Sequence, residues 1–565
     1  MPRVALNASL ETGGQGRELS RECRSQPSGA YRRSATRGRR ASGEAINCSR
    51  NLNLGENGAV SLLFAPASYL HRLSSAMPDA QPPAFPSDST TPSAASTAGQ
   101  TYADALRADP RVAQAKELLR QALAEHAAGL TAVRPADETL RVPYERLLAE
   151  AAAVRGGPLL WPYLSAGVGN GPYVQLADGS VKLDFIGGIG VYGCGHSSPE
   201  LLDAAVDAAL EDVAMQGNLQ QHPPSIRIAE QLVKLASAGG APLSYCMLST
   251  SGAMANENAL KLAFHKAAPA DRVIAFDNAF AGRSLALAAI TDRPKYRQGL
   301  PLALHVDYLP AWNFQRPEES QRLALDEVRR LLARHPGRYA AFWAELIAGE
   351  GGYYPTDPRF FQTLCEPIRA AGIPIIFDEI QTFSRTSQPF AFQHYQLHQY
   401  ADIVTVGKIT QVCATLYRET FKPTAPILSQ TFTGASSSIA IGLETLKLLH
   451  QKECFGSEGW NVRRHRYFAA GLERLATKYP NLIRGPFGEG MMIAFTPGDG
   501  SYEQAKALMD ILFAEGLLGF LCGSDPTRVR FLPPPAITTE QHIDAALELL
   551  DRSLAKFATS LTADA

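Results

Sequence analysis

The sequence predicts an α/β protein built around a large, mostly parallel sheet. Between about residues 200 and 410, short apolar runs alternate with helical patterns, and polar residues follow each run. Continuous apolar runs of this kind are typical of parallel strands that helices cover on both faces. The runs lie at residues 273–276, 341–344, 375–377 and 403–406. With 565 residues the chain is also too long for one compact core, so two or three domains are expected.

The composition narrows the class of protein. Hydrophobic residues make up 45% and charged residues 19%, which is ordinary for a soluble globular protein. The formal net charge of -1 argues against a general nucleic-acid or membrane-surface binder, and no apolar run is long enough to cross a bilayer. The eight cysteines form no CxxC pair, and none has a histidine at metal-ligand spacing. We therefore expect no metal site, and thiols in a reducing, cytoplasmic compartment.

The first 100 residues differ from the rest of the chain. Residues 31–40 are rich in Arg and Ser without helical or strand periodicity, and residues 81–100 form a Pro/Ser/Thr-rich stretch. This composition predicts a disordered arm followed by a flexible linker. Two other interpretations stay open for the arm: an organelle transit peptide, or upstream sequence that is not normally translated. Met77 is an alternative start that favours the last of these.

Local patterns predict three further elements. Order is expected to begin near Asp109, a cap that precedes a first-turn proline. Two apolar runs between residues 172 and 187 flank Asp178 and Gly179, which indicates a β-hairpin. Near the C-terminus, apolar residues at helical spacing predict a helix that Thr538 opens, with Gln541 completing a capping box.

Asp378 comes directly after the apolar run at residues 375–377. A carboxylate at the end of a buried strand is costly unless a cation lies beside it. A protonated pyridine nitrogen is one such cation, because pyridoxal phosphate (PLP) acts as an electron sink while that proton is held in place. From the strand alone, a helix-capping or salt-bridged aspartate is the more common explanation.

Lys408 stands at the end of a second strand, where residues 403–406 lead into Gly407. Functional residues of parallel sheets gather at the carboxyl ends of strands, so the amine of Lys408 could reach the same crevice as Asp378. Burial there would lower the pKa of the amine, as a nucleophilic and proton-shuttling lysine requires. For a lone lysine, a solvated surface position is nevertheless the more frequent outcome.

Small and hydroxylated residues at 249–253 lead into a third element, a helical pattern. Free backbone N–H groups at a helix start, together with hydroxyl groups, form an anion site that fits a phosphate. A plain N-terminal cap explains the same residues equally well.

In their order and setting, these segments resemble one family, the class III aminotransferases of the fold type I PLP enzymes. The resemblance runs from about Tyr173 to Leu554, and eight separated segments carry it. They match the family's small-domain motif, phosphate loop, aromatic-x-Gly-Arg segment, Gly-Glu-Gly segment, strand-end aspartate, Gly-Lys pair, threonine segment and C-terminal Arg-Phe segment. Here they lie at residues 183–196, 251–253, 279–284, 345–352, 378–382, 407–413, 431–434 and 530–534. Residues 408–413 are especially similar to bacterial lysine 6-aminotransferases.

The resemblance assigns roles around the cofactor ring. Lys408 would carry PLP as a Schiff base and shuttle the proton, and Asp378 would hold the proton on the pyridine nitrogen. Gln381 would hydrogen-bond the ring hydroxyl, and Phe280 would stack on the ring face. Phe280 has a structural alternative as a core aromatic, and Glu345, which precedes the Gly-Glu-Gly segment, could serve packing alone.

The remaining roles concern phosphate and substrate. The resemblance implies that the phosphate is bound by Ser251, Gly252, Ala253 and, from the partner subunit, Thr431. The substrate would be bound by Arg283, Glu350 and Arg530. Of these, Glu350 and Arg530 would form a substrate-dependent switch, with a fixed ion pair as the alternative.

The chain also departs from the family pattern. Met254 stands where a Glu is usual, Leu346 where a Pro is usual, and Ala281 where His or Trp is common. The segment after Thr382 is a residue shorter, and residues 435–437 replace the usual Gly-Asn-Pro. None of these changes removes a group that performs the chemistry, so they bear on substrate identity and on loops near the pocket.

As a whole, the resemblance implies the fold type I architecture in a homodimer with shared sites. Residues 101–200 would form an N-terminal helical region and part of a small domain, residues 201–440 the large PLP-binding domain, and residues 441–565 the rest of the small domain. The expected reaction moves an amino group from an ω-amino acid to an oxo-acid, 2-oxoglutarate, by a ping-pong mechanism. Lysine, 4-aminobutyrate, ornithine and acetylornithine all suit the assigned residues.

Two alternatives stay open at this point. An aminomutase, decarboxylase or racemase could use the same fold and the same Lys–Asp pair. A non-catalytic PLP-fold protein could bind nucleic acid through the basic arm, although the presence of Lys408, Asp378 and Arg283 argues against that.

Overall fold

The computed structural model describes residues 99, 101–212, 217, 219–354 and 356–563. The predicted arm, linker and alternative start lie outside the described residues. Helix α1 (Tyr102–Arg107) precedes α2 (Pro110–Ala127) and α3 (Arg141–Arg155). Asp109 caps α2 as expected, but the prediction that order begins there is wrong. Thr101 and Asp104 form a capping box that starts a helix two turns earlier.

A seven-stranded sheet is the largest of the sheets in the described chain. Its spatial order is β4 (Leu243–Ser249), β10 (Cys413–Arg418), β9 (Ile403–Val406), β8 (Ile375–Glu379), β7 (Tyr339–Ala344), β5 (Arg272–Phe276) and β6 (His305–Leu309). From β9 to β6 all neighbours are parallel, whereas β10 runs antiparallel to both β9 and β4. The prediction of a mostly parallel sheet is therefore confirmed.

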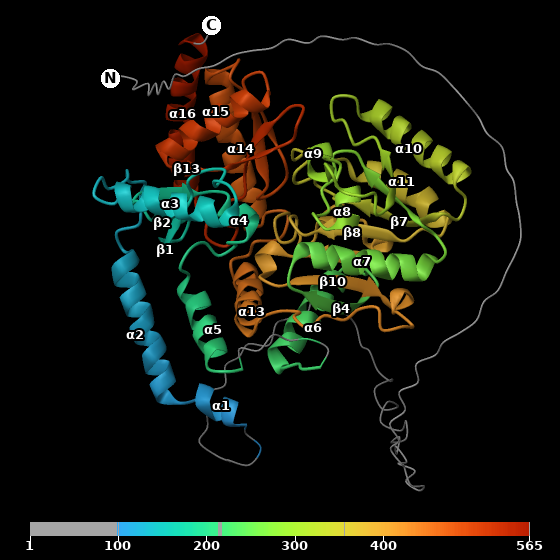
Figure 1. Ribbon diagram of the computed structural model, residues 1–565, viewed down its shortest axis with the longest axis horizontal. Coiled ribbons are helices and arrows are strands. Elements are labelled where there is room, and N and C mark those ends of the chain that lie inside the picture. The colour runs from blue at the N-terminus through green and yellow to red at the C-terminus, as the bar shows by residue number, and fades with distance from the viewer. Residues whose placement is uncertain (1–98, 100, 213–216, 218, 355, 564–565) are drawn as a thin grey trace, which may run out of the picture. The chain divides into compact units, whose positions relative to one another are not determined.

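Helices cover both faces of this sheet, because its strands are apolar on both sides. Ala341 and Trp343 of β7 pack into a core with α7 (Gly252–Ala267) and α8 (Leu285–Ile290). Phe342 and Ala344 point the other way, toward α6 (Pro223–Ser237), α10 (Pro317–Arg334) and α11 (Pro358–Ala370). Figure 1 shows α7 lying across β10 and β4. Side chains therefore alternate between an α7 face and an opposite face along each strand.

Shorter elements connect these layers. They are α4 (Gly187–Gly190), α5 (Pro199–Ala209), α9 (Pro294–Arg297), α12 (Ala391–His394), α13 (Ser436–Gln451) and the 3-10 turns η1 (His398–Tyr400), η2 (Lys408–Thr410) and η3 (Glu419–Phe421). Helix α13 packs against α5 and α6. In the described part of the chain, no helix combines the length and apolar character needed to span a bilayer.

Two four-stranded sheets complete the described chain. The first contains β1 (Ser165–Asn170), β2 (Tyr173–Leu176), β3 (Val181–Asp184) and β13 (Leu517–Leu518), and the second β11 (Ile483–Phe487), β12 (Ile493–Pro497), β15 (Arg528–Phe531) and β14 (Phe520–Cys522). Strands β2 and β3 form the predicted hairpin. Because β13 pairs with β3, N-terminal and C-terminal segments share one sheet and one core with α14 (Trp460–Lys478), α15 (Tyr502–Glu515) and α16 (Glu540–Ala563).

The cap of the last helix differs from the prediction. Helix α16 begins at Glu540, and the hydroxyl of Thr539 accepts a hydrogen bond of 3.4 Å from the backbone N–H of His542. The hydroxyl of Thr538 instead donates to the carbonyl of Pro534 at 2.7 Å. The predicted cap at Thr538 is therefore wrong by one residue, because Thr538 is held by the carbonyl of Pro534 and leaves the capping position to Thr539.

Candidate active site

Asp378 lies at the carboxyl end of β8 on the face that α7 covers. Only 6% of the residue is exposed, and three donors hold its carboxylate. The side-chain amide of Asn256 on α7 donates to Oδ2 at 2.8 Å. The backbone N–H of Ile380 donates to Oδ1 at 3.0 Å, and the hydroxyl of Thr405 on β9 lies 3.5 Å from the same oxygen. These contacts fix the carboxylate at the edge of the sheet.

Burial raises the pKa of Asp378 to about 6, although the hydrogen bonds and the positive charge of Lys408 act to lower it. The shift means that the protein environment alone does not fully compensate the buried negative charge. A carboxylate in this state is suited to a cationic partner that the chain does not itself supply, such as a protonated ring nitrogen.

Lys408 follows β9, the neighbour of β8, so its amine and Asp378 meet at one edge of the sheet. A side chain at Gly407 would place its Cβ 2.8 Å from the sulfur of Cys413, so any other residue there would force the Cys413 side chain to shift. Lys408 itself has a φ of 55°, a left-handed conformation that is uncommon for residues other than glycine. Such strained residues cluster at functional sites, where the surrounding structure holds them in place.

The pKa of the Lys408 amine is lowered to about 8. Burial is the largest cause, and the positive charge of Arg530 adds to it. A larger fraction of the amine is therefore neutral near pH 7 than for an exposed lysine, as a nucleophilic amine requires.

The start of α7 forms a third side of the site. Ser251 caps the helix, and its hydroxyl accepts a hydrogen bond of 3.2 Å from the N–H of Met254. The N–H groups of the first helical residues, Gly252 and Ala253, have no acceptor within the helix. They stand at the positive end of the helix dipole, which favours an anion such as a phosphate.

Glu345 joins two loops beside the site. Its carboxylate accepts hydrogen bonds from the backbone N–H groups of Phe280 at 2.8 Å and of Gly349 at 3.0 Å. Burial and the charge of Asp378 raise the pKa of Glu345 to about 8. Glu345 therefore fixes both the segment that carries Phe280 and the segment that leads to Glu350.

Arg530 on β15 reaches this region from the C-terminal part of the chain. It is fully buried, and its guanidinium donates to the carbonyl of Gly349 at 3.0 Å and to Oε1 of Gln381 at 3.3 Å. Its other terminal nitrogen forms an ion pair with Glu350, whose side chain is 23% exposed. The hydroxyl of Tyr353 also donates to Oε1 of Gln381, at 3.1 Å.

These groups surround a cavity of about 520 Å³, a size suited to a small-molecule site. Eight of the sequence-predicted residues line it, namely Gly252, Ala253, Phe280, Arg283, Glu350, Asp378, Gln381 and Lys408. An amine, a buried carboxylate and a helix start therefore face one space. This donor set fits PLP, whose aldehyde, ring nitrogen and phosphate need these three partners.

The other three predicted residues do not line this cavity. Arg530 lies behind its wall, in contact with Glu350 and Gln381, and Ser251 is exposed at the cap of α7. Thr431 is exposed, and its carbonyl lies near Gly217. Arg283 does line the cavity, where its guanidinium stacks 4.1 Å from the ring centre of Tyr296.

Sequence reasoning missed several residues at the site. Asn256, Val191, Gln411 and Cys413 line the cavity, and Asn256 directly orients Asp378. The sequence could have indicated Asn256, because it is a polar residue among the small apolar residues of the buried face of α7. Gln411 and Cys413 follow Lys408 within a few residues, whereas only the folded chain brings Val191 to the same cavity.

The parallel sheet, the strand-end lysine and the carboxylate beside an anion-binding helix start define a PLP-dependent class of enzyme. The chain belongs to the class III aminotransferase family, whose sequence profile matches residues 162–554. It is thus a PLP-dependent aminotransferase, and both the fold class and the family predicted from the sequence are confirmed.

Similar proteins agree with this assignment. An acetylornithine aminotransferase of Methanocaldococcus jannaschii is 30% identical over 401 residues, which cover 68% of this chain and 91% of that protein. A 2-aminoadipate transaminase of Pseudomonas putida is 31% identical over 412 residues, covering 69% and 95%. Among solved structures, the lysine aminotransferase from M. tuberculosis matches with a TM-score of 0.65 and 25% identity, over 73% of this chain and 99% of that one.

Proposed function

We propose that the protein transfers the amino group of an ω-amino acid to 2-oxoglutarate by a ping-pong mechanism. The observation that carries the proposal is the ion pair between Arg530 and Glu350, at the wall of the cavity that Lys408 and Asp378 line. The relatives named for acetylornithine and lysine support a donor of this class.

Bound PLP supplies the electron sink for bond cleavage at the carbon that bears the amine. Lys408 would hold the cofactor covalently and then move the proton, since its amine has a lowered pKa and lies beside the reacting region. Asp378 would keep the ring nitrogen protonated. The free Nε2 end of the Gln381 amide would bind the ring hydroxyl, because Tyr353 and Arg530 occupy its oxygen.

The phosphate would rest on the start of α7, where Ser251, Gly252 and Ala253 present a hydroxyl and backbone N–H groups. Phe280, fixed by Glu345, would cover the ring face. Thr431 would complete the phosphate site from the partner subunit of a homodimer, which its exposed position in the single chain permits. A cytoplasmic location, suggested by the scattered thiols, stays part of the proposal.

Arg530 and Glu350 would let one pocket accept two unlike substrates. With an ω-amino donor no carboxylate lies near the reacting carbon, and the ion pair keeps the buried arginine neutralised. With glutamate or 2-oxoglutarate, Glu350 would swing away and Arg530 would bind the α-carboxylate through paired hydrogen bonds. The partial exposure of Glu350 supports this, since the carboxylate has space to move whereas Arg530 is enclosed. Arg283 would bind the distal carboxylate.

Separate single-turnover measurements of the two half-reactions test the proposal. The purified enzyme is mixed with lysine, 4-aminobutyrate, ornithine or acetylornithine, and the visible absorbance of bound PLP is followed. We expect one donor to discharge the absorbance and 2-oxoglutarate to restore it with formation of glutamate. A rearranged, decarboxylated or racemised product without glutamate would instead assign one of the alternative PLP reactions.

A dimer test addresses Thr431. We expect sedimentation to show a dimer and Thr431→Ala to weaken PLP binding. At a PLP concentration too low to load Thr431→Ala, mixing its subunits with inactive Lys408→Ala subunits should then restore part of the activity, because one site of the mixed dimer is intact. Failure of such mixtures to regain activity would contradict the shared site.

A further inference from the structure

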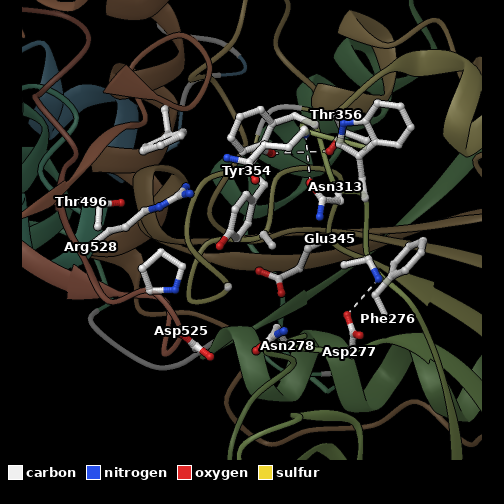
Figure 2. Close-up of a pocket in the computed structure, with 18 of the residues that line it drawn as sticks. Phe276, Asp277, Asn278, Asn313, Glu345, Tyr354, Thr356, Thr496, Asp525 and Arg528 are labelled. Carbon is white, nitrogen blue, oxygen red and sulfur yellow. Dashed lines mark hydrogen bonds between the residues drawn. The ribbon is translucent and has the colours of Figure 1, made fainter. Parts of the chain in front are cut away.

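A second cavity of about 790 Å³ opens at the same carboxyl edge of the large sheet. It lies between the ends of β5, β6 and β7 on one side and the sheet of β11, β12 and β15 on the other. Figure 2 shows Asp277, Asn278 and Glu345 on one side and Thr496, Asp525 and Arg528 on the other. Glu345 lines both this cavity and the active-site cavity, so the two spaces share a wall.

Arg528 is the polar group that defines the inner part of the second cavity. It is only 2% exposed, and its guanidinium lies between the rings of Tyr354 and Phe487, 4.0 and 3.5 Å from their centres. It donates one hydrogen bond, to the carbonyl of Gly352, and its Nε has no acceptor. Burial lowers its pKa.

No carboxylate in the described part of the chain forms an ion pair with Arg528. The contrast with Arg530 is direct, because the two residues lie on the same face of β15 and Arg530 has Glu350 as its partner. A buried guanidinium without a counter-charge is costly, so an anion that enters this cavity would gain a strong partner.

The carboxyl groups of the second cavity do not serve as that partner. Asp277 accepts a hydrogen bond of 2.9 Å from the backbone N–H of Ala311, and burial raises its pKa. Both oxygens of Glu345 accept backbone hydrogen bonds, and its pKa is raised to about 8. Asp525 and Glu473 are exposed at the rim, together with the cationic Arg484.

Aromatic side chains form part of the remaining walls, beside polar residues such as Asn313 and Thr356. Trp312, Phe314, Tyr354 and Phe487 all line the cavity, and Phe314 lies 5.7 Å from Phe487 and 6.4 Å from Tyr354 between ring centres. Flat apolar groups stack favourably on such rings, with gains of about 0.5–1.5 kcal/mol per pair beyond burial. The cavity thus combines an unpaired buried cation with walls for a flat apolar body.

We propose that this cavity is a binding site for a small organic carboxylate with a flat apolar body. The carboxylate would pair with Arg528, and the body would lie against Trp312 and Phe314. The site is separate from the place proposed for PLP, and it does not depend on which amino donor the enzyme uses.

The test titrates benzoate into the full-length holoenzyme and measures heat and tryptophan fluorescence. Benzoate has the required charge and shape, benzamide has the shape without the charge, and benzylamine carries the opposite charge. We expect saturable benzoate binding that changes the fluorescence of Trp312, with benzamide and benzylamine at least tenfold weaker. The fluorescence change should disappear in Trp312→Phe, and the visible absorbance of bound PLP should stay constant.

Two variants locate the site. Arg528→Gln removes the charge, and Ala311→Phe fills the cavity from its rim while keeping the backbone N–H that Asp277 accepts. Each should weaken benzoate at least tenfold, and Ala311→Phe decides the matter if Arg528→Gln does not fold. Equal affinity for benzamide, preference for benzylamine, or benzoate binding that survives Ala311→Phe would each overturn the proposal.

Discussion

The two cavities lie at one edge of the same sheet, yet their charged groups are in different states. In the active-site cavity, Asp378 and Lys408 follow adjacent strands, and each has a pKa moved toward neutrality by burial. In the second cavity, Asp277 follows β5 and accepts a hydrogen bond from the backbone N–H of Ala311, while Arg528 lies between two aromatic rings. The comparison shows that the sheet edge provides the location of both cavities, whereas the neighbours of each charged group decide its electrostatic state.

The largest effect is expected for Lys408→Ala. Loss of both the covalent attachment and the proton-shuttling group should lower turnover by more than about 10³-fold. The wild-type protein should be yellow, and borohydride should fix the cofactor on the peptide that contains Lys408. Lys452→Ala, at an exposed position, is the matched control and should keep full activity. Transamination by Lys408→Ala at the wild-type rate would exclude the assignment.

Asp378→Asn and Asp277→Asn together compare the carboxylates that stand at the ends of β8 and β5. Asp378→Asn keeps the shape but loses the charge, so PLP should still bind while the chemical step slows about 10²- to 10³-fold. Asp277→Asn changes the corresponding carboxyl of the second cavity and should leave turnover within about threefold. Similar losses in both variants would show that the carboxylates serve packing rather than chemistry.

The pH dependence of stability sharpens the same point. Because the pKa of Asp378 in the folded chain is about 6, above its ordinary 3.8, its stabilising contribution is complete below about pH 3.8 and is lost as the pH rises through 6. In PLP-free protein at pH 7, the free energy of unfolding of Asp378→Asn should therefore be about 3 kcal/mol higher than that of the wild type. Near pH 4 the two unfolding free energies should be equal. Urea unfolding at several pH values measures this. With PLP bound, the ring cation should reduce the difference in unfolding free energy between the wild type and Asp378→Asn. If this difference does not change with pH in the PLP-free proteins, the raised pKa of Asp378 is not its cause.

A smaller and asymmetric effect is expected for the ion pair at the wall of the candidate active-site cavity. Arg530→Ala should slow the half-reaction with 2-oxoglutarate about tenfold more than that with the ω-amine, because it removes the partner of the α-carboxylate. Glu350→Gln should ease the reaction with glutamate and weaken the preference for the ω-amine. Single-turnover rates of each half decide this. Equal losses in both halves would mean that the ion pair only holds the pocket together.

The smallest effect is expected for Ala311→Phe, which fills the second cavity. Turnover and KM should stay within about twofold of wild type, because Ala311 lines the second cavity and does not line the candidate active-site cavity. Steady-state kinetics with the best donor measures this. A collapse of activity would show that substrates reach the active site through the second cavity.

Much of the architecture could be predicted because it depends on local patterns. The apolar runs at 273–276 and 375–377 gave buried parallel strands, and Asp178 with Gly179 gave a hairpin. The errors lie at helix ends: Thr101 caps an additional helix before the predicted start of order, and Thr539 rather than Thr538 caps the last helix. Cap choice depends on differences of about 1 kcal/mol between neighbouring threonines or aspartates, which packing overrides.

By itself, the sequence determined which residues stand at the strand ends, because the pattern of apolar runs followed by polar residues is local. Only the tertiary structure decided how those groups behave. The shifted pKa values of Asp378 and Lys408 arise from burial in the folded chain. Groups more than 100 residues away modify them: the amide of Asn256 acts to lower the pKa of Asp378, and the charge of Arg530 lowers that of Lys408. Arg528 and Arg530 look alike on β15, yet one pairs with Glu350 and the other lies between Tyr354 and Phe487, because pairing depends on distances that the chain sets only when it folds.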